Sequence, residues 1–471
     1  MTISDVRRVA GGAGPARSDP ARSDPARSVR APRTADATTL LAIFVTLQLV
    51  LPSRLVMNYL PLSLSAASLV ALLLGLLWIC TQLTTTLGAA KGRNPVRTML
   101  FVYACVLLTS YANAAMSYLP PDERAIGDHT MVIAFALICV SLAVCDGVRS
   151  RARLYFLLRV MVVCGTVVAA FGIMQFLFHF DPTPLLRPPG MHFGSFDAST
   201  GSREGLTRAA GTTANPLEFG VFCAMMLPLA IHVAFHAGRT VGRARFWWAC
   251  TGLIGAGLMF SVSRSAILGV IAATLVLFFG YPARRRVWMA VAGLGFLVVM
   301  KIVSPGLLGT FLSLFQNAGN DSSVQWRTHD YTTAEELIRQ HIWLGRGIGT
   351  WYAPKHEVFD NQYLLTAVDS GVIGLAAFIG VVLAALVATI RVGMLCHRRP
   401  PNLPTVGTDR DLALSLAASL AAVLPTCATF DFLAFATVSA LLFLLVGIAA
   451  ALLRVVAADV AGTPADPHAL V

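Results

Sequence analysis

Long runs of apolar residues, repeated along the chain, constrain this sequence most. Many of the runs approach the roughly 20 residues that a helix needs to cross a bilayer. Apolar residues make up 56% of the 471 residues and charged residues only 13%, whereas soluble domains carry about 25% charged residues. Only helices and closed barrels satisfy backbone polar groups in lipid, and barrel-type alternation is absent from the sequence. The sequence therefore predicts an all-α polytopic integral membrane protein.

We expect about twelve transmembrane helices, each close to the length that a bilayer requires. Their expected ranges are 38–58, 63–83, 97–118, 129–147, 154–178, 215–235, 246–262, 265–281, 287–304, 366–390, 411–429 and 432–453. The first run is interrupted by Pro52, Ser53 and Arg54, and the last two runs are separated only by Phe430 and Asp431.

Basic residues indicate how these helices are oriented. Seven arginines precede Thr38, and further basic clusters fall in every second loop between the expected helices, at 91–97, 149–153, 239–245, 284–286 and 391–410. Cytoplasmic loops carry an excess of Lys and Arg, so this spacing predicts a multi-pass protein with both termini in the cytoplasm. The net charge of +12 is then mostly a consequence of topology, and the sequence does not favour a nucleic-acid partner.

The chain divides into four parts. We expect a disordered cytoplasmic tail at 1–37, which is rich in Arg, Pro and Ser, because such composition cannot form a core. N-terminal transmembrane helices at 38–180, a core at 181–390 and C-terminal helices with a cytoplasmic tail at 391–471 follow. Two long outer loops, 181–214 and 305–365, lie within the core. No cysteine lies in either loop, so the sequence offers no disulfide framework or zinc spacing there, and we expect neither a metal nor a cofactor.

Basic residues on the outer side depart from the charge pattern of membrane proteins. They are Arg187, Arg203, Arg208, Arg264, Arg327, Arg339, Arg346 and Lys355. Arginine suits phosphate because its planar fork donates two parallel hydrogen bonds, so the cluster suggests an anionic ligand at the outer leaflet. The alternative is that these side chains reach lipid headgroups, which applies most to Arg187, Arg339 and Lys355.

Four short motifs follow one another on the expected outer face. They are 208–216 (RAAGTTANP), 263–266 (SRSA), Arg327 with 343–351 (WLGRGIGTW), and 360–364 (DNQYL) with Gly371 and Gly374. In this order they resemble the signature of the O-antigen ligase and O-antigen polymerase superfamily, over about 200–375. The resemblance differs at one position, because ligases of this superfamily typically carry a His where this chain has Asp360.

The resemblance implies a metal-independent glycosyltransferase of the bacterial inner membrane. Its donor would be an oligosaccharide on undecaprenyl diphosphate at the periplasmic face, and an acceptor hydroxyl would displace the diphosphate. Arg208 and Arg264 would then stabilise the departing diphosphate, and Asp360 would be the base. The further residues expected to bind substrate are Arg327, Arg346, Asn361, Tyr363 and His356.

Several alternatives stay open at this point. Asp360 in place of His favours a polymerase of O-antigen, capsule or exopolysaccharide repeat units, which could work with a chain-length regulator. The other readings are a ligase that uses lipid A-core as acceptor, a protein O-oligosaccharyltransferase, and a transporter or flippase that uses Asp431 and Glu218. Asp360 could instead be a helix N-cap, with His356 as the base, and Glu218 reads as a first-turn acid favoured by the helix dipole.

Residues 326–342 carry apolar side chains at helical spacing. We expect an amphipathic helix that lies at the outer interface and covers the site. An ordinary loop helix without ligand contact is the alternative.

Overall fold

The computed structural model describes residues 36–58, 62–84, 94–194, 202–203, 206–238, 241–303, 322–352, 355–357, 359–400 and 403–462. The expected tail at 1–37 therefore lies almost wholly outside the described residues. The long helices are α1 (Ala37–Val50), α2 (Ala66–Leu83), α3 (Pro95–Met116), α4 (Pro121–Gly147), α5 (Arg151–Phe178), α6 (Pro216–Phe235), α7 (Val241–Phe260), α8 (Arg264–Gly280), α9 (Ala283–Val303), α11 (Ser322–Gln340), α12 (Gln362–His397), α13 (Pro404–Cys427) and α14 (Ala436–Val460). Two short 3₁₀ helices, η1 (Thr183–Leu186) and η3 (Phe432–Ala434), lie in loops.

Four short strands accompany the helices and were not expected from the sequence. β1 (Leu55–Met57) pairs antiparallel with β2 (Met191–Phe193), and β3 (Ser202–Arg203) pairs with β4 (Leu206–Thr207). The pairing of Val56 with His192 joins the segment after α1 to the loop after α5. These strands are too short to give a recognisable alternation in the sequence, and they do not change the fold class.

Eight of the described helices are long and apolar enough to cross a membrane, namely α2, α3, α4, α5, α6, α12, α13 and α14. Two shorter apolar helices, α1 and α8, accompany them. The prediction of an all-α polytopic membrane protein is thereby confirmed. The expected range 38–58 was too long, because α1 ends at Val50, where Leu51 is extended and Pro52 follows.

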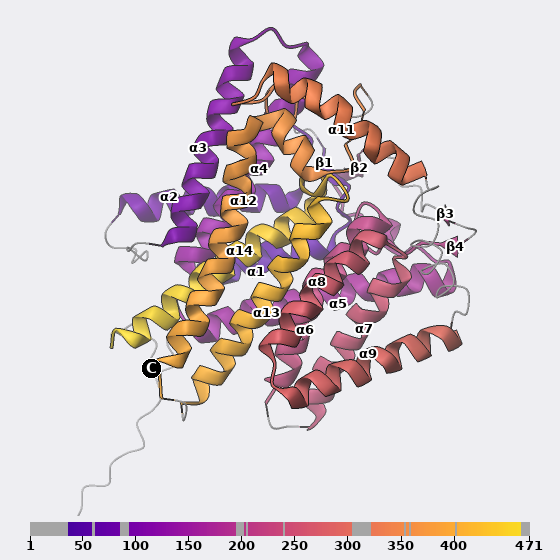
Figure 1. Ribbon diagram of the computed structural model, residues 1–471, viewed down its shortest axis with the longest axis vertical. Coiled ribbons are helices and arrows are strands. Elements are labelled where there is room, and N and C mark those ends of the chain that lie inside the picture. Colours follow the sequence, from indigo (N-terminus) through magenta and orange to yellow (C-terminus); the bar gives the residue numbers. More distant parts are fainter. Residues whose placement is uncertain are drawn as a thin grey trace, which may run out of the picture. The chain divides into compact units, whose positions relative to one another are not determined.

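The helix α14 lies at the centre of the packing. Its side chains are buried along nearly the whole helix, and α4, α12, α13 and α6 pack around it. A Cβ on Gly447 would lie 2.7 Å from the carbonyl oxygen of Ser141, so α14 and α4 approach closely at this glycine. The loop between α13 and α14 lies next to the start of α12 (Figure 1), where the N–H of Gln362 donates to the carbonyl of Phe430.

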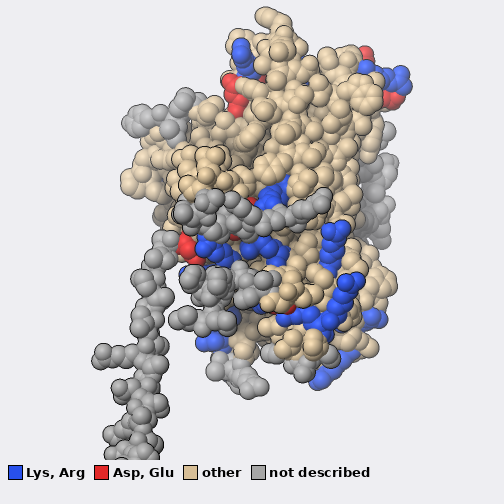
Figure 2. Space-filling model, turned by 90° about the vertical axis from the view of Figure 1, so that its left-hand side faces the viewer, with Lys and Arg blue, Asp and Glu red and all other residues tan. Residues whose placement is uncertain are grey.

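Ion pairs join many helix termini at one end of the packing, which we name the basic end. They are Arg153–Asp36, Arg97–Asp146, Arg151–Asp409, Arg399–Asp459 and Arg285–Asp411, with closest distances of 2.6–3.2 Å. On the face that Figure 2 shows, Lys and Arg gather mostly in the lower half. The alternating basic clusters of the sequence therefore do meet at one end.

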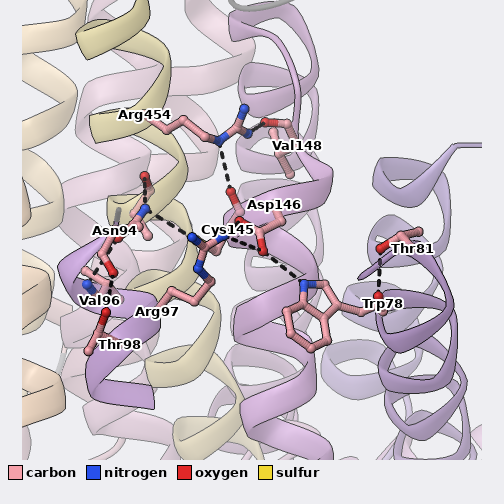
Figure 3. A network of polar contacts seen from close by, with 11 residues as sticks. Trp78, Thr81, Asn94, Val96, Arg97, Thr98, Cys145, Asp146, Val148 and Arg454 are labelled. Atoms are coloured by element: carbon pink, nitrogen blue, oxygen red, sulfur yellow. Dashed lines mark hydrogen bonds and ion pairs between the residues drawn. The ribbon is translucent and has the colours of Figure 1, made fainter. Parts of the chain in front are cut away.

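One part of the basic end joins α2, α3, α4 and α14 (Figure 3). The carboxylate of Asp146 accepts hydrogen bonds from the indole of Trp78 at 3.0 Å and from Arg97 at 3.2 Å. Arg454 donates to the carbonyl oxygens of Cys145 and Val148 at the end of α4. These bonds satisfy the terminal carbonyl groups of α4, which have no partners within their own helix.

The other ends of these helices form the loop end, where the outer-loop motifs lie. The expected helix at 326–342 is present as α11, which packs against the start of α12 (Figure 1). Ala334 of α11, Phe359 and Val368 form a small apolar cluster there. A helix at this place is thereby confirmed, whereas its contact with a ligand stays a prediction.

Candidate functional site

Two of the predicted arginines meet at the turn between α7 and α8. Arg208 donates its Nε–H to the carbonyl oxygen of Ser261 at 3.1 Å, and the backbone N–H of Ala209 donates to Phe260. Arg264 begins α8, directly after the N-cap Ser263, whose hydroxyl accepts from the N–H of Ala266. The structure therefore brings the 208–216 and 263–266 motifs together, although the sequence separates them.

The start of α6 packs directly on this turn. A Cβ on Gly220 would lie 2.4 Å from the hydroxyl of Ser261 and 2.8 Å from the Cβ of Ala266. Only glycine allows this approach, so the N-terminal turns of α6 and α8 lie side by side. Helix N-termini carry partial positive charge and favour anions. The N-terminus of α8 therefore adds positive charge to the corner that holds Arg208 and Arg264, whereas the first turn of α6 carries the carboxylate of Glu218.

Gln175 of α5 shapes the loop that carries Arg208. Its side-chain oxygen accepts from the N–H groups of Ala210 and Gly211, and its nitrogen donates to the carbonyl of Gly211. Gly211 has a φ of 59°, and a Cβ there would lie 2.7 Å from the carbonyl oxygen of Val168. Because Gln175 is only 5% exposed, these bonds fix the course of the loop within the protein.

Asp360 lies beside the loop between α13 and α14. The N–H of Gln362 donates to Phe430 at 3.1 Å, and the side-chain oxygen of Gln362 accepts from the N–H of Leu433 at 2.6 Å. Asp431 stands between these two bonded residues. Burial raises the pKa of Asp431 to about 7, and the nearby carboxylates of Asp360 and Glu218 add to the rise. Three carboxylates therefore gather at the ends of α6, α12 and α13.

The alternative that Asp360 caps α12 is wrong. The N-cap is Asn361, whose side-chain oxygen accepts from the N–H groups of Tyr363 at 2.9 Å and Leu364 at 3.3 Å. The amide of Asn361 also lies 3.5 Å from the hydroxyl of Tyr331 in α11. Asp360 is thus one residue outside the cap and partly exposed.

A second cluster gathers around Glu123 at the start of α4. Its carboxylate is 1% exposed and contacts Arg346 at 2.6 Å, Lys355 at 3.0 Å and His356 at 3.1 Å. A bond to Asp122 raises the pKa of Lys355. The ring of His356 also stacks on Trp351, with 4.2 Å between centroids. The segment that carries Arg346 and His356 is therefore fastened to α4.

The glycines of the 343–351 motif fit this segment around a break in α12. Gly371 has a φ of 69° and a ψ of −175° within α12, and a Cβ there would lie 2.2 Å from the carbonyl oxygen of Trp343. Gly345 has a φ of 70°, and its Cβ would lie 2.4 Å from the carbonyl oxygen of Asp369. The side chain of Asp369 in turn accepts from the N–H of Gly349 at 3.0 Å. The glycines of the motif thus allow the backbone of the loop to pack closely against the backbone of α12.

The remaining predicted residues have different surroundings. The hydroxyl of Tyr363 donates to the carbonyl of Leu424 at 2.7 Å, which ties α12 to α13. Arg327 lies in α11, and its side chain is outside the described part of the chain. The structure therefore places Arg208 beside the turn that precedes Arg264, whereas Arg346 and His356 both contact the carboxylate of Glu123.

Reasoning from the sequence missed Glu123 and Gln175. Glu123 follows Pro120 and Pro121 and reads as an ordinary first-turn acid, and Gln175 lies in an apolar run. A polar side chain within such a run was the available signal, because it needs a bonding partner in a membrane protein. Among the described residues, no three His, Cys, Asp or Glu side chains group as a metal site would need.

The fold and the gathered motifs define a class, a multi-pass α-helical membrane protein whose loop-end site is built from arginines and carboxylates. The family model for O-antigen ligase matches residues 249–379 of this chain. The matched range runs from α7 to α12 and includes Arg264 and Asp360. The resemblance to the O-antigen ligase and O-antigen polymerase superfamily is thereby confirmed. No curated protein matches the chain.

Proposed function

We propose that this protein is a periplasmic-facing glycosyltransferase of the inner membrane that uses an undecaprenyl-diphosphate oligosaccharide as donor. It transfers the oligosaccharide to a sugar acceptor and polymerises repeat units of a surface polysaccharide. The observation that carries the proposal is the bond from Arg208 to Ser261, because it brings Arg208 to the turn that holds Arg264. Two guanidinium groups and the N-terminus of α8 there match the charge of a departing diphosphate.

The proposed reaction is a single displacement. The acceptor hydroxyl attacks the anomeric carbon, the bond to the diphosphate oxygen breaks, and its electrons leave with the undecaprenyl diphosphate. Arg208 and Arg264 stabilise the negative charge on that leaving group. Asp360 accepts the hydroxyl proton, and attack from the opposite face inverts the anomeric carbon.

The neighbourhood of Asp360 supports this role. Carboxylates close to one another make ionisation costly, and such repulsion raises the proton affinity of the group that gains the proton. Asp431, which lies near Asp360, has a pKa raised to about 7, mainly by burial. The cluster therefore holds a carboxylate that can bind a proton near neutral pH next to the proposed base.

The position of the chain in the membrane completes the proposal. We propose twelve spans, in which α7 and α9 cross the membrane together with the ten apolar helices. The basic end then faces the cytoplasm, and the loop end faces the periplasm, where the lipid-linked donor is presented.

The test replaces the arginines in protein reconstituted with a lipid-linked oligosaccharide. Arg264→Ala and Arg208→Ala should each lower the rate of transfer by roughly a hundredfold to a thousandfold, the usual loss for one transition-state charge contact. Arg→Lys should restore only part of the rate, because the fork geometry is lost. Arg187→Ala is the matched control, since Arg187 is an exposed arginine of the same outer side and donates to Met191. A normal rate for Arg264→Ala would refute the diphosphate site.

A ligase is the second candidate, because the matched family model is described as O-antigen ligase. Deletion of the gene distinguishes the two. Single repeat units on the surface lipid indicate a lost polymerase, whereas lipid A-core without any attached glycan indicates a lost ligase.

A further inference from the structure

A fully buried carboxylate joins the two sides of the proposed site. Glu218 lies in the first turn of α6 and is 0% exposed. One of its oxygens accepts from the backbone N–H of Ala214 at 2.7 Å, and the other accepts from the backbone N–H of Thr437 at 2.7 Å. The bonded segments therefore lie on either side of a single carboxylate.

The bond to Thr437 completes another helix. α14 begins at Ala436 after Phe435, and Phe435 provides no side-chain cap. The first N–H groups of a helix have no partner within it, and a carboxylate at this end is also favoured by the helix dipole. Glu218 supplies this cap from a position 219 residues away in the sequence.

Each of the two bonded segments is connected to a different part of the proposed site, one to the arginines and the other to Asp360. Ala214 ends the loop that begins at Arg208, and this loop rests on the turn before Arg264. Thr437 follows the 430–433 turn, which the backbone and side chain of Gln362 hold beside Asp360. The bridge through Glu218 thus connects the arginines to the carboxylate that accepts the proton.

We infer that Glu218 is a positioning residue that sets the separation between Arg208 and Asp360. Both of its oxygens are occupied by backbone N–H groups and none of its surface is exposed, so Glu218 does not touch the substrate. The inference rests on the proposed function. It assigns Glu218 a positioning role in glycosyl transfer, whereas a transporter would use Glu218 to bind an ion.

Glu218→Gln tests the bridge with little change in volume. A Gln side chain keeps one acceptor oxygen, but its NH₂ group faces a second N–H, so one of the two segments is released. Misplacement of reacting groups by about 1 Å can cost a hundredfold in rate. We therefore expect kcat to fall roughly tenfold to a hundredfold, while KM for the donor changes by less than about threefold because both arginines remain.

A crosslink provides the rescue. Ala214→Cys and Thr437→Cys place two thiols on the segments that Glu218 joins, and oxidation should restore most of kcat to Glu218→Gln. If Glu218→Gln alone is poorly produced, the crosslinked triple variant is compared with the crosslinked parent, and their kcat values should agree.

Asp146→Asn is the matched control, because Asp146 is a carboxylate of 3% exposure at the opposite, basic end. An unchanged kcat in Glu218→Gln would overturn the inference, as would an equal loss in Asp146→Asn or a crosslink that forms without rescue. Failure of the proposed function is recognised separately, by Arg264→Ala and Arg208→Ala with normal transfer.

Discussion

Asp360 and Asn361 are neighbours with separate tasks. The structure gives the helix cap to Asn361, whose side chain binds two N–H groups of α12. Asp360 is therefore not the residue that caps the helix, and its carboxylate lies near that of Asp431. The sequence alone could not decide this point, because Asp and Asn are both favoured N-caps and the start of a helix is uncertain by one or two residues.

Asp360→Asn should abolish transfer while the protein accumulates normally in the membrane. The Asn amide has nearly the shape of the carboxylate but accepts no proton, and the cap at Asn361 is untouched. Transfer rate per folded protein is the measurement. Asp146→Asn is the control, because it makes the same substitution at a buried carboxylate of the basic end, away from the site. An active Asp360→Asn variant would remove Asp360 from the reaction and make His356 the next residue to test.

Glu123→Gln should lower the stability of the protein, and we expect this to be its main effect rather than a change in substrate binding. The change leaves the guanidinium of Arg346 and the ammonium of Lys355 without their buried partner. Breaking a buried ion pair costs about 3–5 kcal/mol, and we expect the lower part of this range because Arg346 is 25% exposed. Thermal unfolding in detergent measures the loss. Arg339→Ala, which breaks an exposed pair with Glu335, should change stability by less than about 1 kcal/mol.

The helices were predictable to different degrees. Apolar runs of near-bilayer length identified α2, α3, α5, α6 and α14 well, because burial in lipid or protein leaves a continuous pattern. The ends were less predictable, since polar residues continue a helix beyond the apolar run, as at Pro121 in α4 and His397 in α12. The break in α12 was not predicted, because Gly371 follows Asp369 and Ser370 inside the expected helix 366–390, and these residues do not by themselves specify a break.

Gly371→Ala tests the break against a matched glycine of the same helix. The φ of 69° and the 2.2 Å approach to Trp343 predict a clash that the backbone has to relieve. A strained left-handed residue costs roughly 1–3 kcal/mol before any clash. At Gly393 of α12 a Cβ meets nothing within 4 Å, so Gly393→Ala should stabilise by roughly 0.5–1 kcal/mol. Thermal unfolding of both variants is the measurement, and equal stability would contradict the break.

The pairing of distant motifs was the part of the site that sequence reasoning could only infer by resemblance. Arg208 meets the turn of Arg264 through a bond to Ser261, and no periodicity of the sequence specifies which helix ends are neighbours. The charge pattern did specify which ends lie together. Its arginines and aspartates are brought into contact at the basic end, as at Arg151 and Asp409.

Reporter fusions test the orientation of the entire chain. A reporter after Ser313, which lies outside the described residues, should read as periplasmic, and one after Gly407 should read as cytoplasmic. The reason is that the basic end carries the ion-paired arginines, and excess positive charge stays in the cytoplasm. A cytoplasmic result after Ser313, or a periplasmic result after Gly407, would place the arginine site on the opposite side of the membrane from a lipid-linked donor on the outer leaflet.

The contact between Glu123 and Arg346 spans 223 residues of the chain. At synthesis rates of 5–20 residues per second, about 10–45 s pass between the emergence of the two partners from the ribosome. During that interval the first turn of α4 has no cation to bind, so the nascent protein has to keep Glu123 in water. The docking of the 343–357 segment onto α4 is therefore a late step of biogenesis, because this helix was inserted long before.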